Sequence, residues 1–303
     1  MKHSKQQCVL VLVAVVWGSL YLLAKRLGGA SILDFLILRF AFASLALLPL
    51  AWRGKRTIRR NEFAWGMTAG VFLGAVYLCL MAALQFSDSA SVGAISALTI
   101  ACVPLLDFVL TRRDIQPQTG LGICLGVLGV RFFSTAASAA NSTGIFLALL
   151  GALCYAIYFV VVERIPRSAN VINVSFVQMA CVMGLCVGLR FIAGTGQSAI
   201  ETRGSVLLAA AICGVLGNAI GFTAQNWAQR FISSHRAALL LSLESPFAVL
   251  FGVLGQESLS IGMMLGCLVM FAGVWLVLSG AGKDTAAPAP QADEESERSS
   301  PWA

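Results

Sequence analysis

Apolar blocks recur along this chain, each about 20 residues long, and a helix of that length crosses a hydrocarbon layer about 30 Å thick. Short polar clusters separate the blocks. Only 12% of the residues are charged, whereas soluble globular proteins carry about 25%. The sequence therefore predicts an all-α membrane protein.

The blocks predict ten transmembrane helices joined by short connections. They cover residues 8–24, 33–52, 64–83, 88–110, 118–135, 143–162, 170–193, 204–224, 234–255 and 260–280. From about residue 282 the composition changes to Ala, Pro, Asp, Glu and Ser, which cannot bury a core. We expect residues 282–303 to form a disordered cytoplasmic tail.

Ten crossings place both termini on one side of the membrane, and the basic residues indicate which side. Fifteen of the 21 Lys and Arg residues fall on the terminal side, five fall on the opposite side, and Arg39 lies within a span. Because cytoplasmic loops are enriched in these residues, both termini are predicted to be cytoplasmic, in a bacterial inner membrane. The cations flank spans and form no basic groove, so the net charge of +7 does not predict a nucleic-acid partner.

The two halves of the chain resemble each other, at offsets of 138 to 144 residues. The matched positions are Trp17–Tyr21 with Tyr155–Phe159, Asp34 and Arg39 with Asn173 and Gln178, Pro104 with Pro246, and Gly122–Gly129 with Gly266–Gly273. Each half, residues 8–135 and 143–280, holds an odd number of predicted spans, so the second half enters the membrane from the opposite side. Such an inverted repeat supports two mirror-like conformations around a binding site near the midplane.

The same residues carry a resemblance to a known family. They include Trp17-Gly-Ser19, Arg39-Phe40, Cys154-Tyr-Ala-Ile-Tyr158, Gln178, Gln225-Asn-Trp-Ala-Gln229, Ser242-Leu-Glu-Ser-Pro246 and Gly255-Gln-Glu257. Over residues 8–280 the chain resembles the EamA-type transporters of the drug/metabolite transporter superfamily. The resemblance implies a 5+5 inverted-repeat bundle that exports or takes up small metabolites, amino acids or drugs. One departure is Thr111-Arg-Arg113, where the first repeat of the family often has an acidic turn like Gly255-Gln-Glu257.

Two charged residues lie deep within predicted spans, where a charge costs at least about 2.5–3.5 kcal/mol. Glu244 is expected either to bind solute and carry a coupling proton, or to be a structural partner for Arg39 or an amide. Pro246 removes a backbone hydrogen bond beside it. Arg39 could bind a solute carboxylate with its planar fork or pair with Asp34, and we favour the pairing.

Uncharged polar and aromatic residues complete the candidate binding site. Gln178, Asn218 and Gln225, together with Asn226, either line a path for a polar solute or join helices to one another. Trp17, Tyr21 and Tyr158 lie near the expected binding site, where they either cover a solute or anchor the protein at the membrane interface. Tyr21 and Tyr158 are the preferred pair.

The predicted function is secondary transport of a small solute across the lipid bilayer by alternating access. No GxxxxGK[ST] motif for a nucleotide motor is present. With two histidines and no CxxC pair, the sequence predicts no metal site, no cofactor and no catalytic residues. The alternatives are an intramembrane enzyme acting on a lipid-like substrate, a passive pore, or a structural membrane subunit.

Overall fold

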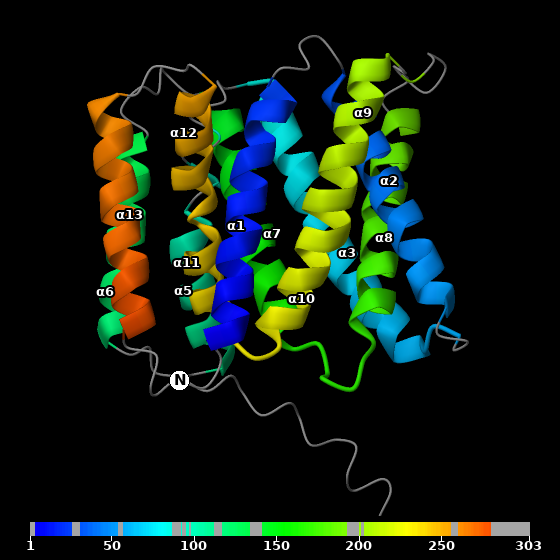
Figure 1. The fold of residues 1–303 in the computed structure, drawn as a ribbon, viewed down its shortest axis with the longest axis horizontal. Coiled ribbons are helices and arrows are strands. Elements are labelled where there is room, and N and C mark those ends of the chain that lie inside the picture. The colour runs from blue at the N-terminus through cyan, green and yellow to red at the C-terminus, as the bar shows by residue number, and fades with distance from the viewer. Residues whose placement is uncertain are drawn as a thin grey trace, which may run out of the picture.

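The protein is a bundle of helices that run roughly along one common direction (Figure 1). The computed structural model describes residues 4–25, 31–53, 57–86, 92, 95–96, 98–111, 117–133, 141–192, 200, 203–255 and 260–279. These residues form helices and short connections, and none of them forms a strand, so the prediction of an all-α fold is confirmed. The predicted tail, residues 282–303, lies outside the described residues, as do residues 88–91, 93, 94 and 97 of the predicted span 88–110.

The helices of the first half follow the apolar blocks. They are α1 (Ser4–Lys25), α2 (Ile32–Arg53), α3 (Arg60–Ala83), α5 (Thr99–Thr111) and α6 (Pro117–Phe133). The second half contains α7 (Ser142–Glu163), α8 (Val171–Ile192), α9 (Gly204–Ile212), the π-helix η3 (Cys213–Phe222), α10 (Thr223–Gln229), α11 (Ser234–Leu241), α12 (Glu244–Leu254) and α13 (Ile261–Ser279).

Six helical segments among the described residues are long and apolar enough to cross a membrane. They are Ile32–Trp52, Arg60–Ala83, Ser142–Glu163, Val171–Ile192, Gly204–Gln229 and Ser234–Leu254. Shorter apolar helices occupy Ser4–Leu20, Thr99–Leu110 and Ile261–Val277.

Two of the predicted spans differ in form from the structure. The span predicted at 204–224 continues to Gln229, because Gln225, Asn226 and Gln229 are fully buried and form hydrogen bonds inside the bundle. The span predicted as one helix over 234–255 is two helices, α11 and α12, with a turn between them.

The contacts between helices reflect the repeat: when each helix is replaced by its equivalent in the other half, the same pairs recur. Helix α1 packs on α12 as α7 packs on α5, and α2 packs on α9 and η3 as α8 packs on α3. Helix α3 packs on α7 as α10 and η3 pack on α1. Two further pairs, α2 with α8 and α6 with α13, join corresponding helices of the two halves.

The α6–α13 pair shows this exchange at the level of single glycines. A Cβ atom added to Gly122 would lie 2.8 Å from the carbonyl oxygen of Gly273, and one added to Gly129 would lie 3.0 Å from that of Gly266. Gly122 and Gly129 match Gly266 and Gly273 in the sequence repeat, so equivalent residues make reciprocal contacts across an antiparallel pair. The missing side chains let the two backbones approach closely.

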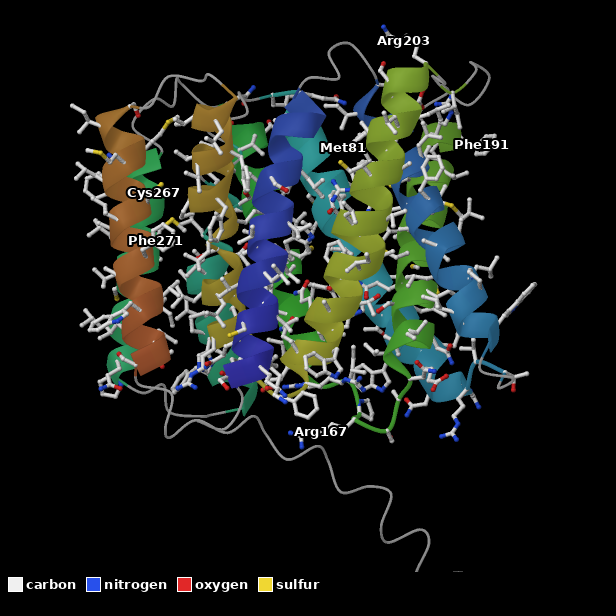
Figure 2. All side chains as sticks on the ribbon, viewed as in Figure 1. Met81, Arg167, Phe191, Arg203, Cys267 and Phe271 are labelled. Atoms are coloured by element: carbon white, nitrogen blue, oxygen red, sulfur yellow. The ribbon has the colours of Figure 1, made fainter. Side chains whose placement is uncertain are left out.

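The two ends of the bundle are polar, and the surface between them is apolar. The first turn of α1 and the last turn of α13 lie at the same end, which is the lower end in Figure 1. Figure 2 shows Arg167 at this lower end and Arg203 at the upper end. Between the ends, large apolar side chains such as Phe191 and Phe271 are 69% and 44% exposed.

Candidate solute-binding site

The turn between α11 and α12 places a carboxylate inside the bundle. Pro246 has no N–H group to donate to the carbonyl of Ser242, which instead accepts a 3.1 Å hydrogen bond from the backbone nitrogen of Ser245. Glu244 is the first residue of α12. Its negative charge is favoured there, because the N-terminus of a helix carries a partial positive charge.

Arg39 reaches from α2 into the second half of the chain. Its Nε atom donates a 2.8 Å hydrogen bond to Oδ1 of Asn218 in η3. Its guanidinium carbon lies 6.0 Å from the centroid of the Tyr77 ring, at the limit of a cation–π contact. The structure therefore corrects the expected pairing of Arg39 with Asp34. The two residues are five positions apart, about 140° around a helix, and so do not face each other. Asp34 instead pairs with Arg190 of α8.

The π-helix η3 brings Asn218 and three glycines against α1 and α2. The carbonyl oxygen of Gly217 accepts a 2.8 Å hydrogen bond from Nε1 of Trp17. A Cβ atom on Gly221 would lie 2.6 Å from the same nitrogen, and one on Gly214 would clash with the carbonyl oxygen of Arg39. π-Helical segments are rare and are frequent at functional sites.

Glu244, Tyr77 and Tyr155 are enclosed by protein, yet each keeps part of its surface accessible. The carboxylate of Glu244 lies within electrostatic range of Arg39 and of both tyrosines. Among the described residues, Glu244 makes no direct ion pair. We refer to Arg39, Tyr77, Tyr155, Asn218 and Glu244 as the central polar cluster; its members come from α2, α3, α7, η3 and α12.

A second set of polar side chains is fully buried and joins three helices. Gln178 of α8 donates a 3.1 Å hydrogen bond to the hydroxyl of Tyr158 in α7. Asn226 of α10 donates to Oε1 of Gln178 at 2.7 Å and to Oγ of Ser175 at 2.9 Å. Tyr158 donates to Oδ1 of Asn226 at 3.4 Å. We refer to these four residues as the Tyr158 network. In this network Gln178 and Tyr158 satisfy each other rather than facing an open space.

The remaining predicted residues lie around these two groups. Trp17 is 7% exposed, and its ring packs 4.9 Å from that of Phe222. Gln225 is buried and donates a 2.9 Å hydrogen bond to Gln229, while its own Oε1 has no hydrogen-bond partner among the described residues. Tyr21 belongs to α1, but its side chain lies outside the described residues. Sequence reasoning did not single out Tyr77, because a lone tyrosine in an apolar block resembles an interface anchor.

A set of hydrogen bonds joins two connections at the lower end of the bundle. Nη1 of Arg230 donates to the carbonyl oxygens of Pro166, Arg167 and Ala169 at 3.0, 3.3 and 2.9 Å. The Arg167 guanidinium lies 4.7 Å from the Phe231 ring centroid. Burial lowers the pKa of Arg230 from its ordinary value, and the charge of Arg167 lowers it further. We refer to the contacts of Arg230 and Arg167 as the lower clasp. It ties the α7–α8 connection to the α10–α11 connection.

Glutamates strengthen the same end of the bundle. Oε2 of Glu163 accepts from the backbone nitrogen of Ser234 at 2.8 Å, which joins the end of α7 to the start of α11. Glu62 of α3 accepts from the backbone nitrogen of Asn170 at 2.9 Å and from Nδ2 of Asn173 at 2.7 Å. Oδ2 of Asp107 in α5 lies 3.4 Å from Nδ1 of His235 in α11.

Two comparisons of sequence agree with this architecture. The family model described as the EamA-like transporter family matches residues 5–135 and again residues 142–279. The chain belongs to the EamA-like transporter family. An "Uncharacterized transporter" of Archaeoglobus fulgidus is 26% identical over 247 residues, which cover 80% of this chain and 76% of that relative. The resemblance to EamA-type transporters is thus confirmed, and this EamA-like chain is a multi-pass membrane transporter.

The fold of this EamA-like transporter also matches solved structures. One of them, described only as the crystal structure of a protein, matches with a TM-score of 0.78 and 16% sequence identity. The match covers 92% of this chain and 98% of that one. At this identity the match shows a shared fold alone. No group of three or more His, Cys, Asp or Glu side chains within the described residues could hold a metal ion.

Proposed function

We propose that this EamA-like protein is a secondary transporter that moves a small metabolite, amino acid or drug across the cytoplasmic membrane by alternating access. It has ten transmembrane helices in two inverted five-helix repeats, residues 8–135 and 143–280, and both termini are cytoplasmic. The reciprocal glycine contacts of α6 and α13, and the first and last described turns at the same end, support this organisation.

The central polar cluster carries the proposal. It places a cation from the first repeat within electrostatic range of a carboxylate from the second, at a helix interruption inside the bundle. Discontinuous helices next to charged side chains are a common way to build midplane binding sites between inverted repeats. The solute binds in this cluster, and Glu244 takes up the coupling proton. The lower clasp closes the cytoplasmic side in this conformation, and it opens in the other.

A thermal-shift screen of metabolites on the purified protein, followed by counterflow in proteoliposomes, tests the proposal. We expect at least one stabilising compound, and we expect that compound to show saturable counterflow. The screen is repeated with Glu244→Gln across a range of pH. A compound that stabilises both proteins equally at every pH would remove Glu244 from the binding and coupling roles. Flux that never saturates would indicate a pore.

One set of contacts favours the alternative of an enzyme. Oγ of Ser233 lies 3.1 Å from Nε2 of His235, whose Nδ1 faces Asp107, an order that resembles a hydrolase triad. The three residues are 5%, 8% and 3% exposed, which leaves little room for a substrate. We therefore interpret these contacts as structural ones that hold the start of α11 against α5. Labelling of the purified protein by a fluorophosphonate, with loss of the label in Ser233→Ala, would support the enzyme instead.

A further inference from the structure

We propose that Arg39 and Asn218 together form a subsite for a singly charged oxyanion, such as the carboxylate of the transported solute. This inference rests on the proposed transport function and adds to it the chemical class of the solute. It depends on the hydrogen-bond donors of these two side chains that have no acceptor among the described residues.

The bond between the two side chains fixes the direction of the Asn218 amide. Arginine has donors only, so the Asn218 atom that faces Nε of Arg39 must be the carbonyl oxygen Oδ1. The amide nitrogen Nδ2 must then point elsewhere. Asn218 is fully buried, and Nδ2 has no hydrogen-bond partner among the described residues. A buried donor without a partner is costly, so Nδ2 is suited to receive an acceptor from a bound molecule.

Arg39 carries further donors on the guanidinium group that binds Asn218. Its Nε is taken by Asn218, while its two terminal nitrogens make no hydrogen bond to any described residue. The side chain as a whole is half-buried. Two parallel N–H groups match the two oxygens of a carboxylate, which makes this type of contact stronger than a bond between neutral groups.

Gly217 lies beside the guanidinium of Arg39 and has no side chain to cover it. A Cβ atom at this position would lie 3.4 Å from the Arg39 Nη2 atom and 2.8 Å from Cδ1 of Leu20. A larger side chain would therefore occupy the space beside Nη2. The Tyr77 ring borders the guanidinium at 6.0 Å, and the indole N–H of Trp17 is already bonded to Gly217. Arg39 and Asn218 thus supply the free donors of the subsite.

The charges around Arg39 favour a ligand with a single negative charge. Asp34, the nearest acid along α2, pairs with Arg190, so it does not neutralise Arg39. Glu244 acts on Arg39 electrostatically but makes no direct ion pair with it in the described part of the chain. A bound monoanion would be the first direct counter-charge of Arg39. When Glu244 is ionised, its repulsion disfavours a second negative charge, so a carboxylate should bind better than a phosphate dianion.

Binding of matched acid and amide probes to the purified full-length protein tests the subsite. The probes are acetate with acetamide, benzoate with benzamide, and inorganic phosphate at an alkaline pH where it is mainly the dianion. The readout is a concentration-dependent shift of the unfolding temperature. We expect one or both carboxylates to bind, neither amide to bind, and phosphate to bind more weakly. Arg39→Gln and Asn218→Leu should each weaken carboxylate binding about tenfold or more. Arg164→Gln, the same change at an exposed arginine, should leave it unchanged.

The outcomes separate this inference from the transport function. Equal binding of acids and amides, or equal loss with Arg164→Gln, would overturn the oxyanion subsite. Phosphate binding more tightly than both carboxylates would overturn the preference for a monoanion. If saturable counterflow persists with solutes that lack an acidic group, and Arg39→Gln does not weaken it, the transport function stands and the subsite fails. If no solute shows counterflow while acids still bind, the transport function fails alone.

Discussion

The Nε atom of Arg39 lies 2.8 Å from Oδ1 of Asn218, a contact between residues 179 positions apart in the chain. It ties α2, in the first half, to the π-helix of the second half. Any motion that separates α2 from η3 must break a hydrogen bond from a charged donor. The presence of this hydrogen bond therefore depends on how the two halves are arranged.

Replacement of Asn218 by alanine removes the acceptor for Arg39 and leaves a half-buried charged donor without that partner. We expect Asn218→Ala to lower the free energy of unfolding by about 1.5–3 kcal/mol, the usual range for a hydrogen bond to a charged group. The measurement is thermal or chemical unfolding of the purified protein in detergent. The matched control is Asn61→Ala, an exposed position in the first turn of α3, where a change within about 0.5 kcal/mol is expected. Equal effects at both positions would contradict the role of the contact.

Replacement of Glu244 by glutamine removes the titratable group of the central polar cluster and keeps its size. In the proposed mechanism, the proton gradient drives solute flux only through this carboxylate. We expect Glu244→Gln to abolish solute accumulation driven by an imposed pH gradient while exchange of solute for solute persists. The measurement compares the two modes in the same proteoliposome preparation. Gradient-driven accumulation that survives the substitution would exclude Glu244 as the coupling group.

The apolar blocks predicted where most helices lie, because hydrophobic length is a local property that needs no knowledge of partners. The same reasoning singled out Arg39, Asn218 and Glu244, because a polar residue at membrane depth is conspicuous in the sequence alone. The partners of those residues were not predictable. Arg39 was matched to Asp34 by closeness in sequence, whereas its actual partner depends on how α2 packs on η3.

The turn between α11 and α12 and the π-helix η3 could not be predicted from local sequence patterns either. Pro246 indicated a lost backbone bond beside Glu244, but the position of the turn between α11 and α12 depends on packing. The backbone of Gly18 in α1 is part of that packing: a Cβ atom there would lie 2.8 Å from the carbonyl oxygen of Glu244. The π-helix has no sequence signal that distinguishes it from an α-helix.

Loss of Arg230 should loosen the lower clasp. Arg230→Met keeps much of the apolar stem but removes three hydrogen bonds to the carbonyls of the α7–α8 connection. We expect a loss of about 1.5–3 kcal/mol in the free energy of unfolding. We also expect faster cleavage by protease within residues 164–170. The control is Arg164→Met, an exposed arginine at the end of α7. Unchanged cleavage in Arg230→Met would show that the clasp does not hold this connection.

The two termini are expected on the same, cytoplasmic, side of the membrane. The concentration of Lys and Arg on the terminal side predicts the orientation. The measurement uses an epitope tag at either end of the chain and protease treatment of intact cells, spheroplasts and inverted vesicles. Both tags should be protected in spheroplasts and cleaved in inverted vesicles. Tags that behave oppositely would contradict an even number of crossings.

Two glycines two residues apart on α6 provide a matched test of the α6–α13 contact. A Cβ atom on Gly122 would lie 2.5 Å from Cγ2 of Val277 and 2.8 Å from the carbonyl oxygen of Gly273, whereas one on Gly120 would meet no atom within 4 Å. Gly122→Ala must therefore push α13 away, and we expect it to cost about 1–3 kcal/mol in the free energy of unfolding. Gly120→Ala should instead be neutral or stabilising by up to about 1 kcal/mol, because alanine favours the helix. The difference is measured by unfolding the two variants side by side. If Gly122→Ala is as stable as Gly120→Ala, α6 and α13 do not pack through their glycines.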